Sequence, residues 1–320
     1  MAQGETIREG GREAVLAPTT TRSPRRRSVL PRGDMLVAIL ALLPSMLAVG
    51  VFIYGFIAWT GYISLVNWND ALPTYVFVGL RNFQTLFATP RFQIDLRNTA
   101  IFATLFMTQC IVVGFALALL LDQRIRGENV FRTIFLLPFA ISSVVTGVAW
   151  RWLMNPASGI NRLLEYAHLD FLKSNWYTSP RIGIAAVTIV ATWQMSGYVM
   201  ALYLAGLRSI PGEIREAAAI DGATGVALYR HVIIPLLTPV TLSAAILLGT
   251  YSLRLFDITV VMTSSGQGFL TDTPALFMFQ TTFQSNKFSQ GSAIAFVMLL
   301  LALLLIVPYM IFSARAEKNQ

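Results

Sequence analysis

Charged residues are scarce in this chain. Of its 320 residues only 12% are charged, while 55% are hydrophobic. An ordinary soluble domain carries about 25% charged residues on its surface. Water is therefore not the main solvent of this chain. The length alone would suggest about two soluble domains, but the scarcity of charge favours a single membrane domain.

Cysteine and histidine are also rare. Cys110 is the single cysteine and lies within an apolar run, so neither an internal disulfide nor a cysteine metal cluster is expected. We interpret it as a small packing residue. The two histidines, His168 and His231, lie far apart in the sequence, which argues against a histidine metal site. We expect no metal or cofactor in the chain itself.

The sequence lacks a phosphate-binding loop. Such a loop needs a glycine before its lysine, so that backbone amides cradle the phosphate. None of Lys173, Lys287 and Lys318 follows a glycine. A convergent set of nucleophile, metal ligands or acid and base is missing as well. We therefore expect the chain not to be an enzyme, and its energy source to be a separate ATPase or an ion gradient.

Long apolar stretches dominate what is present. A membrane helix needs about 20 mostly apolar residues to cross about 30 Å of hydrocarbon, because its backbone amides must all be paired within the segment. Six stretches meet this test, so the sequence predicts an all-α membrane protein with six transmembrane helices. We expect these spans near residues 35–59, 98–121, 130–154, 182–207, 232–262 and 291–312.

The distribution of positive charge predicts the orientation. The net charge is +8, and membrane proteins retain Lys and Arg on the cytoplasmic side. If the N-terminus is cytoplasmic, the segments on that side hold fifteen Lys and Arg residues against seven in the external loops. A nucleic-acid binder would instead interleave basic residues with aromatics on a folded face, and the sequence has no such pattern. We expect a multi-pass plasma-membrane protein with both termini in the cytoplasm.

The two ends of the chain differ from its centre. Residues 1–34 are rich in Arg, Gly, Thr, Ser and Pro, a composition typical of a disordered basic tail. The apolar run that follows is too long for a signal peptide and lacks a convincing cleavage site, so we expect an uncleaved first helix. The predicted membrane domain covers 35–313, with a cytoplasmic loop at 208–235, and a short cytoplasmic tail follows at 314–320.

The loop at 208–235 has a distinct pattern, SIPGEIREAAAIDGATGVALYRHVIIPLL from residue 209 onward. Pro211 suits the first turn of a helix, and Glu213 and Glu216 lie near the positive end of the helix dipole. Gly222 can end the helix with a left-handed backbone. The alanines at 217–219 leave a low surface that the groove of another protein can approach. We predict a short surface helix, since a plain hairpin loop would need no such order.

This segment resembles the cytoplasmic signature of the permease subunits of ATP-binding-cassette importers, which reads EAA, three residues, G, nine residues, then I-x-L-P. Here EAA at 216–218 is followed by Gly222 and, nine residues later, by VIIP at 232–235, with two conservative departures. The longer form EAAxIDGA at 216–223 is similar to the carbohydrate branch that includes the maltose-transporter permeases.

The resemblance extends over about residues 78–312. A GGP-like turn that normally follows the fifth span is replaced here by Ser265, Gly266 and Gln267, which leaves the conformation of that turn open. The other matching pieces are GLRNFQTLF at 79–87, Asn98 and Thr99, Arg132, LLP at 136–138, Trp150, NPASGIN at 155–161, Phe256 and Asp257, and Met262 and Thr263.

The resemblance implies a type I importer permease fold, in which a cytoplasmic coupling helix seats in a cleft of an ATPase subunit. The implied partners are a second homologous permease, an ABC ATPase dimer that binds ATP and Mg, an extracytoplasmic sugar-binding protein, a sugar and the lipid bilayer; no nucleic acid is implied. The implied coupling residues are Glu216, Ala217, Ala218, Asp221, Gly222, Ala223 and Pro235.

Polar and aromatic side chains within the spans are candidates for a sugar path, since sugars need hydrogen-bonding groups and aromatic faces. Gln109 and Gln194 lie near the midpoints of their spans, and Arg254 and Asp257 lie three residues apart, where they could pair. Interhelical hydrogen bonds of the glutamines that hold the bundle together, and snorkelling of Arg254 with a local ion pair, remain open interpretations. The candidate residues are Gln109, Trp193, Gln194, Ser196, Tyr198, Tyr251, Arg254 and Asp257.

Two other functions would require patterns of their own. A proton- or sodium-driven transporter would need ion sites at mid-membrane and usually paired repeats, and a membrane-embedded enzyme would need a convergent catalytic set. The sequence has neither pattern. The predicted function is therefore the permease subunit of an ATP-driven sugar importer, with a monosaccharide, disaccharide, oligosaccharide or polyol all open as substrate.

Overall fold

The computed structural model describes the backbone of residues 32–318 except 71, 124 and 265, and the side chains from 39 to 311 except these three and 267. Most of the predicted basic tail, residues 1–31, therefore lies outside the described residues, as do residues 319 and 320. The chain divides into two units, residues 1–54 and 55–320, and each is described by itself.

The first unit contains a single described helix. It is α1 (Arg32–Val49), and a π-helical turn, η1 (Gly50–Gly55), follows it. The described side chains of the helix, from Ile39 onward, are apolar except for Ser45. Ser45 turns back to donate a hydrogen bond to the carbonyl oxygen of Leu42, so the part of the helix whose side chains are described, 39–49, exposes no unpaired side-chain polar group to an apolar solvent.

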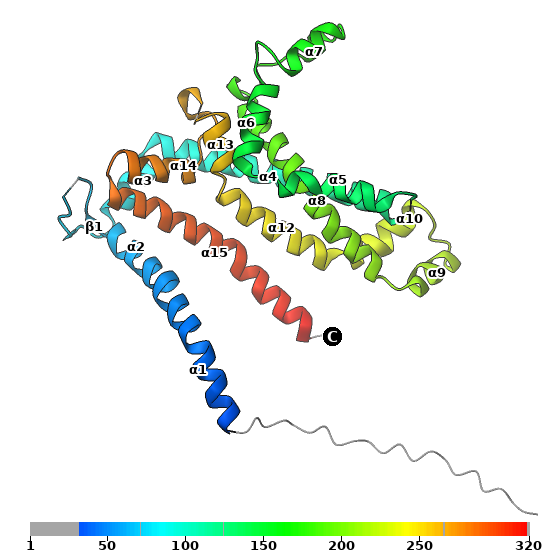
Figure 1. Ribbon diagram of the computed structural model, residues 1–320, viewed down its shortest axis with the longest axis horizontal. Coiled ribbons are helices and arrows are strands. Elements are labelled where there is room, and N and C mark those ends of the chain that lie inside the picture. Colours follow the sequence, from blue (N-terminus) through cyan, green and yellow to red (C-terminus); the bar gives the residue numbers. More distant parts are fainter. Residues whose placement is uncertain (1–31, 71, 124, 265, 319–320) are drawn as a thin grey trace, which may run out of the picture. The chain divides into compact units, whose positions relative to one another are not determined.

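The second unit is a helical bundle (Figure 1). In it α4 packs along the length of α8, while α5 and α12 lie beside this pair and α15 packs on α2 and α12. The bundle has an α9 end, which carries α9 and α10, and an α14 end, which carries α3 and α14. The main helices are α2 (Phe56–Ser64), α4 (Pro90–Asp122), α5 (Glu128–Ala140), α8 (Gly183–Ser209), α12 (Thr238–Leu253) and α15 (Phe288–Lys318).

Short elements connect the main helices. The strands β1 (Val66–Asn67) and β2 (Val76–Phe77) pair antiparallel, with Val66 opposite Phe77. The short α-helices are α3 (Arg81–Ala88), α6 (Ser143–Leu153), α7 (Ile160–Tyr166), α9 (Gly212–Ile220), α10 (Val226–Leu228), α11 (Ile234–Leu236), α13 (Asp257–Met262) and α14 (Pro274–Phe279). The single turns are η2 (Asp170–Leu172), η3 (Trp176–Thr178), η4 (Tyr229–Ile233), η5 (Gln267–Phe269) and η6 (Gln280–Gln284).

The all-α membrane fold is confirmed. Among the described residues, four helices are long and apolar enough to cross a membrane, or up to six if each of two bent pairs counts as one span. The four correspond to the predicted first, second, fourth and sixth spans. They are Ile39–Ser64, Pro90–Asp122, Gly183–Ser209 and Phe288–Ile311.

The predicted third span at 130–154 is interrupted. It is two helices, α5 and α6, bent by 96°. Pro138 in the last turn of α5 has no amide hydrogen to donate, and the next turn does not continue, because Ile141 and Ser142 are extended (ψ 138° and 136°). The side-chain amide of Gln194 donates to the freed carbonyl oxygen of Ile141 at 2.8 Å.

The predicted fifth span at 232–262 is also interrupted. Its first part meets α12 at a bend of 65°, where Pro235 and Pro239 stand on either side of Leu237 and remove two amide donors. A second break follows at Phe256 (φ −134°, ψ −62°), and α13 begins at Asp257. The apolar composition predicted the crossing but not these two breaks.

Protein surrounds α8 on almost all sides. Within its most apolar stretch 72% of residues are buried, against 11% for α15. Small residues such as Ala191 and Gly197 let neighbouring backbones approach, which is how membrane helices gain packing energy when lipid is as apolar as their side chains. The core beside α8 includes Phe102, Phe106 and Cys110 of α4, so Cys110 occupies the packing position predicted for it.

The closest approach gives a stability prediction. A Cβ on Gly197 would lie 1.8 Å from the carbonyl oxygen of Phe135 in α5, so Gly197→Ala must push the two helices apart. We expect a loss of about 1–3 kcal/mol in the free energy of unfolding, seen as a lower melting temperature in detergent. Gly249→Ala is the control, because its Cβ would meet Leu305 at 3.4 Å, an ordinary contact. Equal melting of the two variants would contradict this account of the α5–α8 contact.

Candidate functional site

The loop at 208–235 contains the predicted short helix, α9 (Gly212–Ile220). Pro211 stands just before the helix as its N-cap rather than in the first turn, and Glu213 is in the first turn. Gly222 has a φ of +81°, and the amide of Ala223 donates to the carbonyl oxygen of Ala218 at 2.8 Å. These are the left-handed residue and the long bond of a Schellman ending, so the predicted stop at Gly222 is confirmed.

The proposed coupling residues are mostly exposed on this loop. Ala218 is buried, with 8% of its surface exposed, and Ala223 is half-buried. Pro235 is exposed but belongs to α11, a separate helix from α9. The exposed residues on α9 and its C-terminal turn are Glu216, Ala217, Asp221 and Gly222.

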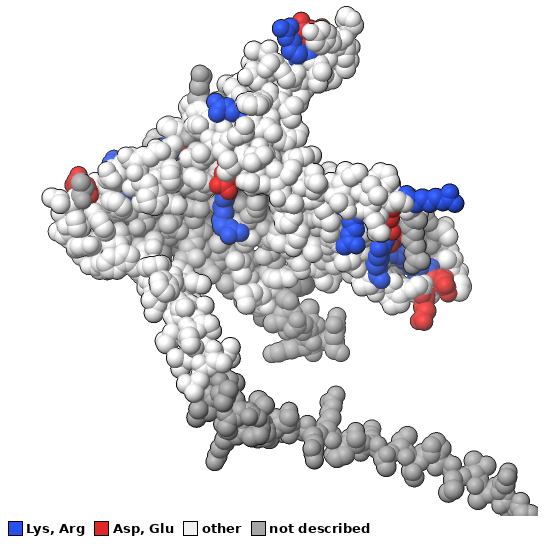
Figure 2. Space-filling view, viewed as in Figure 1, with Lys and Arg blue, Asp and Glu red and all other residues white. Residues whose placement is uncertain are grey.

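Two large apolar residues beside the coupling residues were missed by the sequence analysis. Ile220 is 86% exposed and Val226 is 82% exposed. They lie at a charged end of the bundle, where Figure 2 shows acidic and basic side chains gathered around α9 and α10. An apolar patch rimmed by charge is typical of a protein interaction surface. The sequence signal for these two residues is that large apolar side chains occur between charged and small residues in the loop at 212–226.

Two ion pairs connect the segments at the α9 end. Arg215 of α9 contacts the carboxylate of Asp122 at 3.0 Å, and Arg208 of α8 contacts that of Glu128 in α5 at 2.6 Å. Both pairs line a cavity of about 840 Å³ that opens between α9 and the ends of α4, α5 and α8. One of the two pairs, Arg215 with Asp122, attaches the short helix to α4.

The candidate path residues Gln109 and Gln194 each hydrogen-bond within the bundle. The side-chain oxygen of Gln109 accepts from the hydroxyl of Thr192 at 3.0 Å. Gln194 donates to Ile141 at the α5–α6 break, and its amide atoms lie 3.4 Å from the hydroxyl of Ser143. Both glutamines thus hold helices together, and the break brings further polar groups to the same depth.

The aromatic candidates each contact another aromatic ring. The remaining candidate, Ser196, is not aromatic; it is buried on α8, the helix that also carries Trp193 and Tyr198. The pairs are Trp193 with Trp150 at 5.7 Å between ring centroids, Tyr198 with Phe139 at 4.9 Å, and Tyr251 with Phe106 at 5.3 Å. Trp193 and Tyr198 lie near the middle of α8, and Tyr251 lies in the last turn of α12.

Arg254 and Asp257 do not pair. Both are exposed. None of the ion pairs within 4 Å in the described part of the chain includes either of them. The sequence interpretation assumed one continuous helix, which would place them on one face. Because α12 ends at Leu253 and α13 begins at Asp257, that register is lost. Arg254 lies instead in a groove between α12 and α15.

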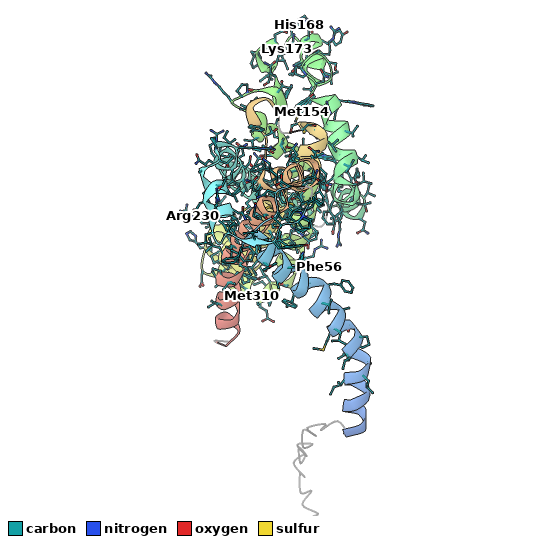
Figure 3. All side chains as sticks on the ribbon, turned by 90° about the vertical axis from the view of Figure 1, so that its left-hand side faces the viewer. Phe56, Met154, His168, Lys173, Arg230 and Met310 are labelled. Carbon is teal, nitrogen blue, oxygen red and sulfur yellow. The ribbon has the colours of Figure 1, made fainter. Side chains whose placement is uncertain are left out.

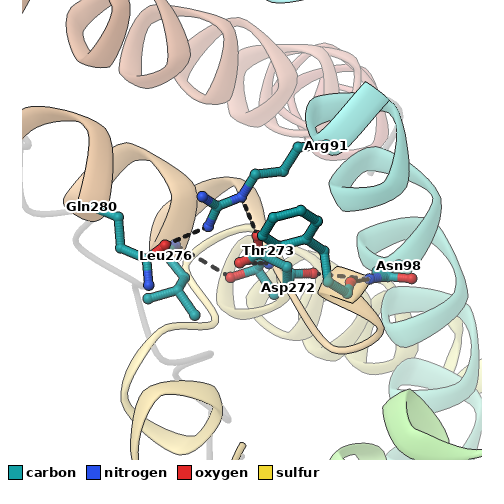
Figure 4. A network of polar contacts seen from close by, with 7 residues as sticks. Arg91, Asn98, Asp272, Thr273, Leu276 and Gln280 are labelled. Atoms are coloured by element: carbon teal, nitrogen blue, oxygen red, sulfur yellow. Dashed lines mark hydrogen bonds and ion pairs between the residues drawn. The ribbon is translucent and has the colours of Figure 1, made fainter. Parts of the chain in front are cut away.

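A buried charge cluster joins α4 to the segment before α14 (Figure 4). Arg91 donates to the carboxylate of Asp272 at 2.6 Å and to the side-chain oxygen of Gln280 at 2.5 Å. Its guanidinium also lies 4.5 Å from the ring centre of Phe269 and 4.4 Å from that of Phe277, a cation–π arrangement. The cluster fixes the loop that follows the fifth span against the start of α4.

A second carboxyl group, Asp95, lies near this cluster. Asp95 and Asp272 are both fully buried and interact electrostatically with each other and with Arg91. Neither carboxylate oxygen of Asp95 has a hydrogen-bond donor among the described residues. One guanidinium therefore serves two buried carboxyl groups, and its loss would leave both without a cation.

Three buried asparagines hold non-helical segments in place. Asn82 donates to the carbonyl oxygens of Ser64 and Val66, and Asn98 donates to those of Phe269 and Asp272. Carbonyls outside helices need such partners where water is excluded. In the sequence these asparagines are visible only as members of the segments that carry the resemblance, and nothing in the pattern predicts this role.

The third asparagine, Asn161, organises an arm that contains α7. Its amide donates to the carbonyl oxygens of Pro156 and Ser174, and its oxygen accepts from the indole of Trp176. Figure 3 shows His168 and Lys173 on this arm, beyond Met154. Lys173 contacts the carboxylate of Asp170 at 2.5 Å, and this hydrogen bond raises the pKa of Lys173.

Comparison with known families gives one match over most of the chain. Residues 126–319 match the family described as binding-protein-dependent transport system inner membrane component. This stretch includes α5 through α15, and so contains α9, both bent helix pairs and the segment before α14.

Individual relatives match along nearly their whole length. A probable ABC transporter permease protein of Pyrococcus horikoshii is 43% identical over 287 residues, which cover 89% of this chain and 98% of that protein. A xylose/arabinose import permease protein of Haloferax volcanii is 34% identical over 261 residues, covering 79% and 81%. In fold, the chain is similar to a subunit of a bacterial alginate ABC transporter crystallised with an alginate-bound periplasmic protein, with a TM-score of 0.73, 21% identity and coverage of 86% and 92%.

The charge cluster gives the second prediction. Arg91→Gln leaves the carboxyl groups of Asp95 and Asp272 buried without a cation, and removing one partner of a buried ion pair costs about 3–5 kcal/mol. We expect a large drop in melting temperature in detergent. Asp95→Asn removes the carboxyl group that has no donor, so it should melt near the wild type or above it.

Arg97→Gln is the matched control for this prediction, because Arg97 is an exposed arginine on the same helix. It should leave the melting temperature unchanged. Equal losses for the variants at 91 and 97 would show that the cluster does not stabilise the fold.

Proposed function

This chain belongs to the family of inner membrane components of binding-protein-dependent transport systems, and on that basis we propose that it imports a sugar by alternating access, driven by a separate ATPase through α9. The observation that carries the proposal is α9 itself, a short helix that exposes Glu216 and Ala217 of the EAA pattern and is followed by the exposed Gly222. A permease of this family is a transport subunit and not an enzyme.

Coupling through α9 is supported by its geometry. The helix is short and closed by a Schellman ending, so it can be displaced as a rigid body. Glu216 and Ala217 are exposed, and Ile220 and Val226 add apolar area beside them. A cleft of an ATPase can cover this surface, with its own basic groups facing Glu216. ATP and Mg then bind in that partner.

The bent helices supply a means of alternating access. A transporter must switch between two packings, which a partner can bias by binding one of them better. The α5–α6 break at Ile141 and the α12–α13 break at Phe256 are positions where backbone angles can change without disrupting a continuous helix. Movement of α9 would reach both through the long helices that end beside it.

The orientation follows from the same assignment. With α9 docked on an ATPase, the α9 end faces the cytoplasm and the α14 end faces the outside. In the sequence, the segments predicted to be cytoplasmic hold fifteen Lys and Arg residues against seven in the predicted external loops, which supports this orientation. It also places the arm around α7 outside, where an extracytoplasmic binding protein delivers the substrate.

A sugar is the substrate class that we favour. One relative in which the match covers 81% of the protein is described as a xylose/arabinose import permease. The polar and aromatic side chains in the middle of the bundle, Gln109, Trp193, Gln194, Ser196, Tyr198 and Tyr251, can hydrogen-bond and stack on a sugar if the helices that they now join separate during transport. Arg254 and Asp257 belong to the proposed path at its outer end.

The complete transporter contains more than this chain. We propose a second homologous permease that forms a heterodimer with it, an ATPase dimer in the cytoplasm and a binding protein outside. The family description supports the binding protein directly, since it names binding-protein-dependent transport.

Glu216→Lys tests the proposal. The variant places a positive charge on the exposed docking surface of α9, so we expect the ATPase to dissociate from the complex and uptake of labelled sugar to fall at least tenfold, about 1.4 kcal/mol in binding. The variant chain itself should stay in the membrane. Association is measured by co-purification, and uptake is measured in proteoliposomes.

Asp70→Lys is the control for the charge change. Asp70 is exposed in the loop between β1 and β2, at the α14 end, so this variant should retain the ATPase and full uptake. Undiminished uptake with Glu216→Lys, or wild-type uptake without any ATPase, would refute the assignment.

A further inference from the structure

We propose that Arg215 is the positioning residue that transmits movement of α9 to the ends of α4 and α8. The inference rests on the proposed function, because it concerns the route by which an ATPase drives the long helices. It goes further in assigning that route to one guanidinium group, which lies outside the EAA and glycine pattern.

One guanidinium contacts both long helices. The Nη1 atom of Arg215 lies 3.0 Å from a carboxylate oxygen of Asp122, the last residue of α4, and its Nη2 atom donates to the carbonyl oxygen of Leu207 in the last turn of α8 at 3.0 Å. The planar fork of arginine can hold two acceptors at once, which a lysine cannot do with the same rigidity. Arg215 therefore joins three helices at one point.

Both acceptors need a cation or donor. The carboxylate of Asp122 stands at the negative end of the α4 dipole, and its side chain is only 9% exposed. The carbonyl of Leu207 is among the last four of α8, which have no partner within the helix. Arg215 satisfies both groups, so the contact is favourable in each helix and resists separation of α9 from them.

Little else attaches the side chains of α9 to these helices. Within residues 212–220, all of which the structure describes, Arg215 alone forms a side-chain hydrogen bond or ion pair with another helix. Ala218 is the one buried residue of α9. A push on the exposed surface of α9 thus reaches α4 through the Arg215–Asp122 contact.

The helices that receive the push are central to the bundle. α4 packs along α8 over much of its length, and α4 has 33 residues, about 50 Å at ~1.5 Å per residue. Its other end carries Arg91, which holds the segment before α14. Displacement of α4 at Asp122 is therefore coupled to the opposite face of the membrane.

A neighbouring ion pair serves as a matched control. Arg208 contacts Glu128 at 2.6 Å, and its side chain is 40% exposed against 33% for Arg215. This pair has the same chemistry and lines the same cavity, but it joins α8 to α5 and does not involve α9. Loss of general ion-pair stability would affect both pairs equally, whereas loss of transmission affects Arg215 alone.

The experiment uses the complete transporter, with its ATPase, second permease and binding protein, in proteoliposomes. The readout is sugar uptake per ATP hydrolysed, with co-purified ATPase measured on the same samples. For Arg215→Gln and for Asp122→Asn we expect the ATPase to remain bound and this ratio to fall at least about fivefold, the lower range of allosteric coupling. Arg208→Gln should keep the wild-type ratio.

Two further variants make the test specific. Arg215→Lys keeps a charge opposite Asp122 but not both contacts, so its ratio should lie between those of Arg215→Gln and the wild type. The exchange of charges in the double variant Arg215→Asp, Asp122→Arg should raise the ratio above that of either Arg215→Gln or Asp122→Asn. If the single variants assemble poorly with the ATPase, the double variant still tests whether the contact between positions 215 and 122 transmits movement.

Several outcomes would overturn the inference. These are an unchanged ratio in Arg215→Gln, an equal loss in Arg208→Gln, or no recovery in the exchanged pair. If the wild-type chain neither binds an ATPase nor couples hydrolysis to uptake, the proposed function fails. If the wild type couples and Arg215→Gln couples equally well, only the role of Arg215 fails.

Discussion

Hydrocarbon cannot pair a backbone amide or carbonyl, and at two places where this protein departs from a continuous helix a polar side chain supplies the partner. At the α5–α6 break the side chain of Gln194 takes the carbonyl of Ile141. At the start of α4, Asn98 takes two carbonyls of the segment before α14. These polar side chains are costly in lipid, so they lie inside the bundle, where the protein replaces the missing water.

This requirement explains why α8 occupies the centre. It carries the buried polar groups Thr192, Gln194 and Ser196, and it also carries small residues that let α5 and α12 approach. The same side chains that compensate for the breaks are candidates for contact with a substrate. In our proposal, a hydrogen bond that holds two helices in one packing is exchanged for a bond to a sugar in the other packing.

Charge is used differently at the two ends of α4. Near its N-terminus, Arg91 is enclosed with Asp272 and Asp95 and fixes a loop. At its C-terminus, Asp122 meets Arg215 in a partly exposed contact, which water can screen and which can therefore be remade during a conformational cycle. A buried cluster suits a rigid attachment, and an exposed pair suits a moving one.

The sequence alone determined the membrane class, the approximate positions of the spans, the short helix at 212–220 and its stop at Gly222. These follow from apolar length, charge and glycine conformation, which are properties of local sequence. The tertiary structure decided the 96° bend at Ile141, the separation of Arg254 from Asp257, and the contacts of Arg215 and Arg91. Each of these depends on a partner from another helix, because a proline allows a break in several geometries and a distant side chain selects one.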